Sequence, residues 1–581
     1  MALRRGVWLV IILLVLAVFV SAAGLLLLYG AVGREPQVAR NSTLVLRLDG
    51  DFAEVEPGGV LGSFIESTTT VRSIVETLRK AKADSRISSV IIKPAGAAAL
   101  WGKVQEIRDA IVDFRRSGKP IIAYMEYGGE QEYYLATACD KVFLMPVASL
   151  DLTGIASYEL FLRGMLDKIG AYPDALHIGD YKTASNTFTE HTFTPAHREM
   201  AESLNTDLYQ QLVRGIADGR HKSEANVKAL IDHGPFLPED ALRVGLIDDL
   251  AYEDELDDKV KLAAGTPRYV ELNDYRQVSP VSLGLGRGPR IAVIYAVGII
   301  ASGRSNYESP QGQVVGSDTI VEYLRKARAD SSVKAIVLRV DSPGGSAIAS
   351  DVIWREVMLT KTQKPVIASM SDVAASGGYY IAMPAHAIVA EPSTLTGSIG
   401  VVITKFVIDG TLKKLGLNME GVSQGKYAGM YSPVRPFTPE ERARMAENMQ
   451  ATYDTFVEKA AQGRNTTPER IDAIGQGRVW TGRQAKQIGL VDELGGLERA
   501  LAIAKQRAKI PVDSEVELVV YPPRKSIYDV IRSPFGAADQ SARLGSLLGF
   551  TNPRILQALA APLQVFRRGE PLALMPNVFV R

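Results

Sequence analysis

DVAASGGYY at residues 372–380 is the stretch of sequence that indicates the fold most directly. The short apolar run before it, VIA at residues 366–368, predicts a buried strand, and the tyrosines after the two glycines predict the start of a helix. A serine at such a strand-to-helix turn exposes its hydroxyl beside the positive end of the helix, which favours an anion formed there. Ser376 is therefore a candidate nucleophile; the alternative is that it only caps an ordinary helix.

Length and composition limit the class of protein. At 581 residues the chain is too long for one hydrophobic core, so two or more domains are expected. Its 66 basic and 65 acidic residues nearly balance and give no field that would attract nucleic acid. The single cysteine, Cys139, excludes an internal disulfide and a cysteine-based metal cluster. No metal-ligand spacing or phosphate-binding loop is found in the sequence, so we expect neither a metal nor a cofactor.

The N-terminal residues predict a membrane anchor. Residues 7–29 are almost wholly apolar and, at 1.5 Å per residue, long enough to cross the ~30 Å hydrocarbon layer. A cleaved signal peptide is the alternative, because residues 21–23 resemble a cleavage site, but the apolar run continues well beyond them. Arg4 and Arg5 predict that residues 1–6 stay in the cytoplasm and that the rest of the chain lies outside the inner membrane.

The chain after this segment contains an internal repeat. LRKAKADS at residues 78–85 matches LRKARADS at residues 324–331 in all but one place, an offset of 246. The same offset, within a few residues, relates landmarks along both halves, which indicates two domains of one fold that arose by duplication. We predict an N-terminal domain at residues 40–275, a linker at 276–290, a C-terminal domain at 291–515 and, at 516–581, a tail that docks on a partner.

Both halves alternate short apolar runs with amphipathic segments. In the second half, an amphipathic segment at residues 321–328 leads to the apolar run at 335–338. A glycine turn, a second helical segment at 350–360 and the apolar run at 366–368 follow. This order predicts βαβ units around a parallel sheet, and hence the α/β class.

The two copies differ where chemistry would be expected. Residues 341–345 of the second copy read DSPGG, whereas the first copy has AGAAA at 95–99. Successive glycines let backbone N–H groups point inward at an anion, which alanines in a strained turn do less easily. No serine precedes the tyrosines in the first copy. Where the second copy has Ser398, the first copy has Ile155. A nucleophile, an oxyanion turn and an extra hydroxyl are thus expected in the second half.

One difference runs the other way. When the copies are aligned on Tyr181 and Tyr427, Lys182 of the first copy corresponds to Ala428 of the second. The copy without the serine therefore has a lysine that the copy with the serine lacks, which predicts one composite site. Lysine acts as a base only if its pKa falls by several units, which burial can achieve. The alternative is an ordinary surface lysine beside Asp180.

Four motifs together resemble the signal peptide peptidases of peptidase family S49, in their long, tandem-duplicated bacterial form. The motifs are DSPGG at 341–345, AASGGYY at 374–380, STLTGSIG at 393–400 and GDYKTA at 179–184. The resemblance covers the whole chain and implies two Clp-protease/crotonase-like (ββα superhelix) domains after one transmembrane helix. It implies a membrane-anchored serine endopeptidase that faces the periplasm, forms a homotetramer and degrades signal peptides left in the inner membrane.

The resemblance also implies roles for individual residues. Ser376 would be the nucleophile, Lys182 the general base, and Ser398 the residue that orients the lysine amine. The implied oxyanion donors are the N–H groups of Gly344, Gly345 and Gly377. The sequence leaves open whether the lysine and the serine meet within one chain or between subunits.

Three other functions remain open at this point. A Ser-His-Asp peptidase on the same fold would show a pH–rate limb near ~6.5; its candidate bases are His177, His191, His197 and His386. A crotonase-type acyl-CoA enzyme would use oxyanion N–H groups without a Ser/Lys pair, and a fluorophosphonate label on Ser376 would argue against it. A non-catalytic, oligomeric membrane scaffold would gain nothing from the reciprocal loss of serine and lysine.

Overall fold

The computed structural model describes most of the chain. The described residues are 36–55, 69–97, 99–260, 268–306, 313–523, 572–575 and 579–580, with Val15, Leu16 and Phe19 standing alone. Apart from those three, the anchor predicted at residues 7–29 lies outside the described residues, as does most of the tail predicted at 516–581. Within the described ranges, no helix has both the length and the apolar character needed to cross a bilayer.

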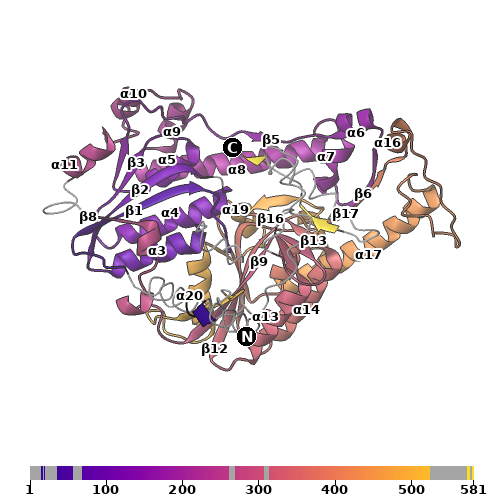
Figure 1. Cartoon of the computed structure of the whole chain (residues 1–581). Helices are drawn as coiled ribbons and strands as arrows, with labels where there is room; N and C mark the ends of the chain where they lie inside the picture. Colours follow the sequence, from indigo (N-terminus) through magenta and orange to yellow (C-terminus); the bar gives the residue numbers. More distant parts are fainter. Residues whose placement is uncertain are drawn as a thin grey trace, which may run out of the picture.

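The first half of the chain is built around a six-stranded parallel sheet, in the order β7-β4-β3-β2-β1-β8 (Figure 1). Its strands are β1 (Ser42–Gly50), β2 (Ile87–Ala97), β3 (Ile121–Met125), β4 (Lys141–Leu144), β7 (Asp249–Leu250) and β8 (Arg268–Glu271). The helices of this half include α3 (Val71–Ala83), α4 (Trp101–Arg115), α5 (Glu130–Ala136), α8 (Pro195–Arg220), α9 (Glu224–Ile231) and α10 (Pro238–Arg243). Alternate leucines of β1 are buried with the apolar face of α3, as the 2.0 and 3.6 periodicities require.

The second half repeats this plan around an eight-stranded sheet, in the order β18-β16-β14-β12-β9-β20, with β15 and β19 attached beside β14. Its strands are β9 (Arg290–Val297), β12 (Val333–Ser342), β14 (Val366–Ala375), β15 (Ala387–Ala390), β16 (Leu395–Gly397), β18 (Val479–Thr481), β19 (Glu493–Leu494) and β20 (Glu517–Tyr521). Its helices include α13 (Ser317–Ala329), α14 (Ala347–Lys361), α15 (Gly377–Ala382), α17 (Pro439–Arg464), α18 (Pro468–Ile474), α19 (Gly482–Gln487) and α20 (Leu497–Arg507). Every residue of β14 is buried, as expected for a central strand of a covered parallel sheet.

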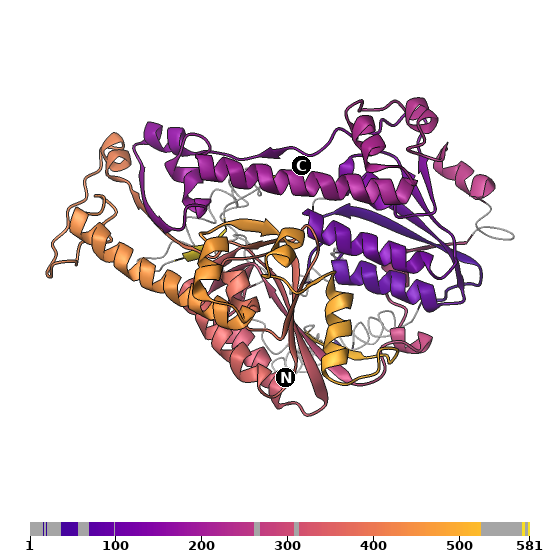
Figure 2. The same cartoon turned by 180° about the vertical axis from the view of Figure 1, so that it is seen from behind.

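The duplication is visible in matched helices. Both α3 and α13 have 13 residues, α4 and α14 have 15, and α8 and α17 have 26. The two longest helices begin alike, with a threonine N-cap followed by proline, and Figure 2 shows both running along the outside of the molecule. Equal lengths at nearly the same offset, 246, 246 and 244 residues, are the expected product of a duplication. The prediction of an α/β fold is confirmed.

A third sheet joins the two halves, in the order β11-β10-β13-β21-β17-β6. Its strands are β6 (Tyr172–Ile178), β10 (Ile299–Ala301), β11 (Val314–Gly316), β13 (Gly344–Ser346), β17 (Val401–Val407) and β21 (Leu572–Leu574). Strand β6 belongs to the first half by sequence, yet it pairs antiparallel with β17 of the second half along its whole length. The chain continues from β6 directly to Lys182, so this crossover carries the lysine into the second half.

Candidate active site

Ser376 occupies a strained turn between β14 and α15. Its backbone has φ 56° and ψ −113°, a conformation that a residue other than glycine adopts only at a cost of about 1–3 kcal/mol. The turn is held by two bonds: Ser376 N–H donates to the Gly397 carbonyl at 2.8 Å, and Tyr380 N–H donates to the Ser376 carbonyl at 2.8 Å. The side chain is fully buried and makes no capping bond to α15. Ser376 therefore stands at the N-cap position without acting as the cap.

Lys182 reaches Ser376 within the same chain. Its side chain is 0% exposed, and Nζ lies 2.7 Å from Ser376 Oγ, 2.9 Å from the Ser398 carbonyl oxygen and 3.0 Å from Ser398 Oγ. Burial lowers the pKa of Lys182 well below its ordinary value, because the ammonium form loses its hydration in this environment. The alternative of an ordinary surface lysine is thus excluded. The structure brings the predicted nucleophile, base and orienting serine together.

Ser398 shares the strain of Ser376. It follows β16 with φ 52°, and its N–H donates to the Arg478 carbonyl at 2.7 Å. The left-handed backbone turns both its carbonyl and its hydroxyl toward the Lys182 amine. Strained non-glycine residues of this kind are common at functional sites, where the surrounding contacts hold the backbone in its strained conformation.

The backbone of Lys182 is seated against Gly477, a residue that the sequence analysis did not single out. A Cβ at Gly477 would lie only 2.5 Å from Lys182 N and Cα, so no larger residue fits there. Tyr181 N–H also donates to the Gln476 carbonyl at 2.8 Å. The signal that could have revealed this contact is weak: at the local offset of 244, the first copy has His233 where the second has the glycine.

Polar and ring contacts surround the segment that leads from β6 to Lys182. The Arg478 guanidinium lies 4.7 Å from the centre of the Tyr181 ring and 4.5 Å from that of Trp480. Glu199 accepts from Arg478 at 2.7 Å and from the Tyr181 hydroxyl at 2.8 Å. Because Glu199 is exposed, each bond contributes little alone, but together they link α8 to the segment that carries Lys182.

The glycine turn after β12 lies beside Ser376. Gly344 has φ +105° and Gly345 φ +150°, values that favour glycine. The Gly344 N–H donates to Ser342 Oγ at 3.1 Å, so this predicted oxyanion donor is already engaged. The other two predicted donor residues are close neighbours: a Cβ on Gly377 would lie 3.1 Å from Gly345 N.

A strand from the C-terminal end of the chain crosses this turn. β21 pairs antiparallel with β13, with Ala573 opposite Gly345, and Met575 N–H donates to the Pro343 carbonyl at 2.8 Å. A Cβ on Gly344 would lie 1.9 Å from the Ala573 carbonyl oxygen and 2.8 Å from Gly377 N. The peptide carbonyl of Ala573 therefore sits directly against the glycine turn.

Apolar residues receive the side chains of this segment. Leu572 packs with Ala184 and Val402, and Leu574 lies against the same cluster. Met575 packs with Val373 and other residues near the end of β14. The site thus accommodates an extended, apolar peptide segment, here supplied by the chain itself.

The four histidines considered as alternative bases have partners other than Ser376. His177 Nδ1 lies 3.0 Å from the Gly179 carbonyl, and His386 Nδ1 accepts from Val366 N–H at 3.1 Å. His197 is buried with Nε2 2.6 Å from Glu159, and His191 lies 3.6 Å from Asp167. In the part of the chain that the structure describes, no group of three His, Cys, Asp or Glu side chains could hold a metal ion.

Known proteins with similar sequences define the class. The chloroplastic serine protease SPPA of Arabidopsis thaliana is 39% identical over 503 residues, which are 85% of this chain and 73% of that protein. Protease 4 of Salmonella typhi is 34% identical over 504 residues, 84% of this chain and 78% of that protein. The chain is a serine peptidase. It belongs to peptidase family S49, which matches it twice, at residues 113–266 and 358–511.

Among solved structures, a membrane-bound stomatin-specific protease, the 1510-N K138A mutant in complex with a substrate peptide, covers 42% of this chain and 96% of its own. Its sequence identity is 20% and its TM-score is 0.26.

Proposed function

We propose that this chain is a membrane-anchored serine endopeptidase that uses a Ser376/Lys182 dyad to degrade signal peptides left in the bacterial inner membrane. The observation that carries the proposal is the distance of 2.7 Å between Lys182 Nζ and Ser376 Oγ, two buried atoms from different halves of the chain. Within this proposal the two domains have the Clp-protease/crotonase-like fold. Residues 7–29 form the anchor, and the catalytic domains face the periplasm.

The lysine amine has a hydrogen-bonding pattern suited to a base. A neutral amine has two N–H donors and one lone pair, and the three oxygen atoms around Nζ match that number. The two N–H groups donate to the carbonyl and hydroxyl oxygens of Ser398, which leaves the lone pair for the Ser376 hydroxyl. The lowered pKa of Lys182 favours the neutral amine, which is the form that can accept that proton.

The reaction then proceeds through an acyl-enzyme. Ser376 Oγ attacks the peptide carbonyl while its proton passes to Lys182, and the Lys182 ammonium returns that proton to the leaving amine. Water hydrolyses the ester with the lysine again as base. The Gly345 and Gly377 N–H groups stabilise the oxyanion, while Gly344 N–H, bonded to Ser342, holds the shape of the turn.

The substrate class is supported by what lies in the site. The β21 segment binds as an extended strand, with apolar side chains against Ala184, Val402 and Val373. A strand bound through main-chain bonds accepts many sequences, and apolar contacts on either side of the scissile bond favour apolar ones. Signal peptides have apolar cores, and recognition within an extended segment suits an endopeptidase.

The substrate proposal is tested by comparing two synthetic peptides of equal length. One has a leucine-rich core, and the other has serine and glutamine in its place. We expect the detergent-solubilised full chain to cleave the apolar peptide with a kcat/KM at least about 10-fold higher, because each buried leucine contributes roughly 1.5–3 kcal/mol. Equal cleavage of both peptides would refute the substrate class and leave the peptidase assignment intact.

We further propose that the chain assembles with copies of itself as a homotetramer. In the first half, the segment after Gly170 crosses onto β17 of the second half. The repeat aligns Gly170 with Gly416, yet the corresponding segment of the second half forms no strand at residues 417–427 and exposes apolar side chains, with Val422 98% exposed. By analogy, it would cross onto the first half of the next subunit, a head-to-tail contact that closes into a ring.

The assembly is tested with Val422→Asp combined with Leu417→Asp, two exposed positions of this segment. We expect light scattering of the solubilised chain to show a tetramer for the parent and smaller species for the variant, because aspartate in an apolar contact is costly. The control is Val512→Asp, an exposed valine in the loop before β20. A monomeric parent chain, or a variant that remains tetrameric, would contradict the proposal.

A further inference from the structure

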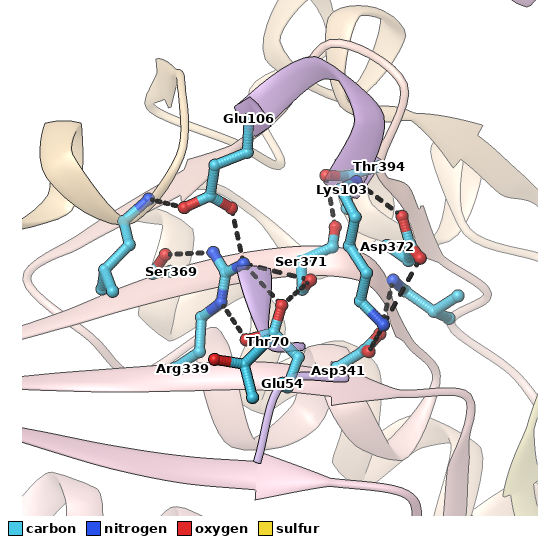
Figure 3. Close-up of polar contacts among 12 residues, drawn as sticks. Glu54, Thr70, Lys103, Glu106, Arg339, Asp341, Ser369, Ser371, Asp372 and Thr394 are labelled. Atoms are coloured by element: carbon cyan, nitrogen blue, oxygen red, sulfur yellow. Dashed lines mark hydrogen bonds and ion pairs between the residues drawn. The ribbon is translucent and has the colours of Figure 1, made fainter. Parts of the chain in front are cut away.

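The junction between the two halves contains a buried cluster of charged side chains (Figure 3). We call it the junction cluster; its members are Glu54, Lys103 and Glu106 from the first half and Arg339, Asp341 and Asp372 from the second. Five of the six are buried, and Asp341 is largely buried. Charged groups are rarely buried unless they are paired. Removing one partner of a buried pair destabilises the fold, because the other charge is left buried and unpaired.

The first helix after β2 takes its cap from the other half. α4 follows Leu100, which supplies no side-chain cap, and Asp372 of β14 accepts from Leu100 N–H at 3.1 Å and from Lys103 N–H at 2.8 Å. The equivalent helix of the second half, α14, is capped locally by Ser346. A carboxylate satisfies the free N–H groups at a helix start and interacts favourably with the helix dipole. The N-terminus of α4 is therefore tied to the strand that leads into Ser376.

Lys103 links this carboxylate to the strand that leads into the glycine turn. Its Nζ lies 2.9 Å from Asp341 and 3.6 Å from Asp372. Burial alone would lower the pKa of Lys103, but the carboxylates of Asp341, Asp372 and Glu54 raise it above its ordinary value, so the amine stays charged.

Asp341 and Asp372 lie where the ladder between β12 and β14 is irregular. Val340 pairs with Met370 but Ser342 pairs with Ala374, so β14 contains extra residues opposite Asp341. The Asp341 carboxylate accepts from Val373 N–H at 3.1 Å, within this irregular stretch. Side chains of the junction cluster thus supply contacts that the regular ladder does not.

The capping is reciprocal. Glu106 of α4 accepts from Leu497 N–H at 2.9 Å, at the start of α20, whose N-cap Gly496 has no side chain. The other oxygen of Glu106 bonds Arg339 at 2.6 Å, and Arg339 also makes a two-pronged contact with Glu54 at 2.8 and 2.9 Å. Each half therefore caps a helix of the other, and β12 is held at Arg339 as well as at Asp341.

We propose that Lys103, Asp341 and Asp372 are positioning residues, through which the first half sets the geometry of the serine turn and the glycine turn. Asp372 lies four residues before Ser376 on β14, and Asp341 lies three residues before Gly344 on β12. The serine turn is strained and depends on its surroundings, the glycine turn lies against it, and a misplacement of about 1 Å can cost about 10²-fold in rate. The first half then contributes these positioning contacts to the site in addition to Lys182. This inference rests on the proposed role of Ser376.

The test uses Asp372→Asn, which keeps the shape of the side chain and removes its charge. We expect kcat per active site to fall about 10- to 100-fold while KM changes by less than about twofold, because the turn rather than the peptide contacts is displaced. Active sites are titrated with a fluorophosphonate, and the rate of labelling should fall in parallel with kcat. The parent chain is labelled first; if its Ser376 does not react, the proposed function fails before the junction cluster is tested.

Three further variants separate positioning from stability. Lys103→Met leaves both capping bonds of Asp372 in place and should lower kcat, whereas Lys103→Arg keeps the charge and should retain most of the activity. The control is Asp84→Asn, another buried carboxylate, which bonds Arg86 and Tyr275 in the first half. It should lower the melting temperature without changing kcat per titrated site.

The proposal is overturned if Asp372→Asn and Lys103→Met keep the parent kcat per titrated site, even when they are less stable. It is also overturned if Asp84→Asn lowers kcat as much as they do. If Asp372→Asn does not fold, Lys103→Met and Lys103→Arg decide the matter alone.

Discussion

Replacing Lys182 with methionine is expected to lower kcat/KM by about 10³-fold or more and to raise the melting temperature. Activity falls because the Ser376 hydroxyl loses the group that accepts its proton. Stability rises because methionine fills a similar volume without the cost of burying an amine. Peptide cleavage, fluorophosphonate labelling and thermal unfolding measure these effects. Ser376→Ala should lose activity to a similar extent, and the double variant should be no worse than the single ones, because the two residues act as a unit.

The same pair predicts a pH dependence with a definite sign. The pKa of Lys182 lies well below 10.5 in the folded chain and returns to its ordinary value on unfolding. Between these two values the unfolded chain binds the extra proton, so the stability of the parent rises with pH, and Lys182→Met should lose that part of the slope. Activity should likewise rise with pH through the lowered pKa of Lys182. A limb near ~6.5 that persists in labelling of Lys182→Met would instead indicate histidine as the base.

The Gly477→Ala variant is expected to lower kcat/KM by about 10²-fold although it adds a single methyl group away from the reacting atoms. That methyl would lie 2.5 Å from Lys182 N and Cα and 2.6 Å from its Cβ. Two rigid backbone segments cannot both remain in place at such distances. The segment that carries the lysine therefore has to shift, and the amine moves away from the Ser376 hydroxyl. Peptide cleavage together with a crystal structure or chemical labelling of the lysine would detect the shift.

The control for this variant is Gly489→Ala. Gly489 has φ +86°, close to the +78° of Gly477, but a Cβ there would meet nothing within 4 Å. Both variants carry the backbone strain of a side chain at positive φ, about 1 kcal/mol, and only one displaces Lys182. Equal activities for the two alanine variants would show that the close approach of Gly477 does not position the base.

The α/β class and the location of the candidate site could be predicted from the sequence because both rest on local patterns. The amphipathic segment and the apolar run predict the positions of α13 and β14. The helix predicted at 321–328 is found at Ser317–Ala329. The sequence points to Lys182 and Ser376 because the two copies differ reciprocally at those positions. A duplicated chain thus carries an internal comparison that a single domain lacks.

Contacts between distant segments could not be predicted in this way. Nothing in the sequence of β6 shows that it joins β17 of the other half, since any apolar strand can pair with another. The junction cluster left only a partial signal: Lys103 corresponds to Ala349 in the second copy and Asp341 corresponds to Ala95 in the first, but nothing in the sequence shows that these two charges meet. The use of Gly344 N–H by Ser342 depends on a turn conformation that composition does not reveal. Nor does the sequence of the tail show that its β21 segment pairs with β13 of the same chain. Docking of the tail on a partner stays a prediction.

The position of β21 has a consequence for which peptides the enzyme can degrade. The Ala573 carbonyl rests against the glycine turn, so a peptide that binds there as proposed would have to displace a competitor attached to the same polypeptide. A covalently attached segment acts at an effective concentration of about millimolar, which dilute peptides in solution do not match. If the enzyme is anchored in the membrane as proposed, peptides confined to the same bilayer reach such local concentrations. β21 would then act as a threshold that admits membrane-bound peptides and excludes dilute soluble ones.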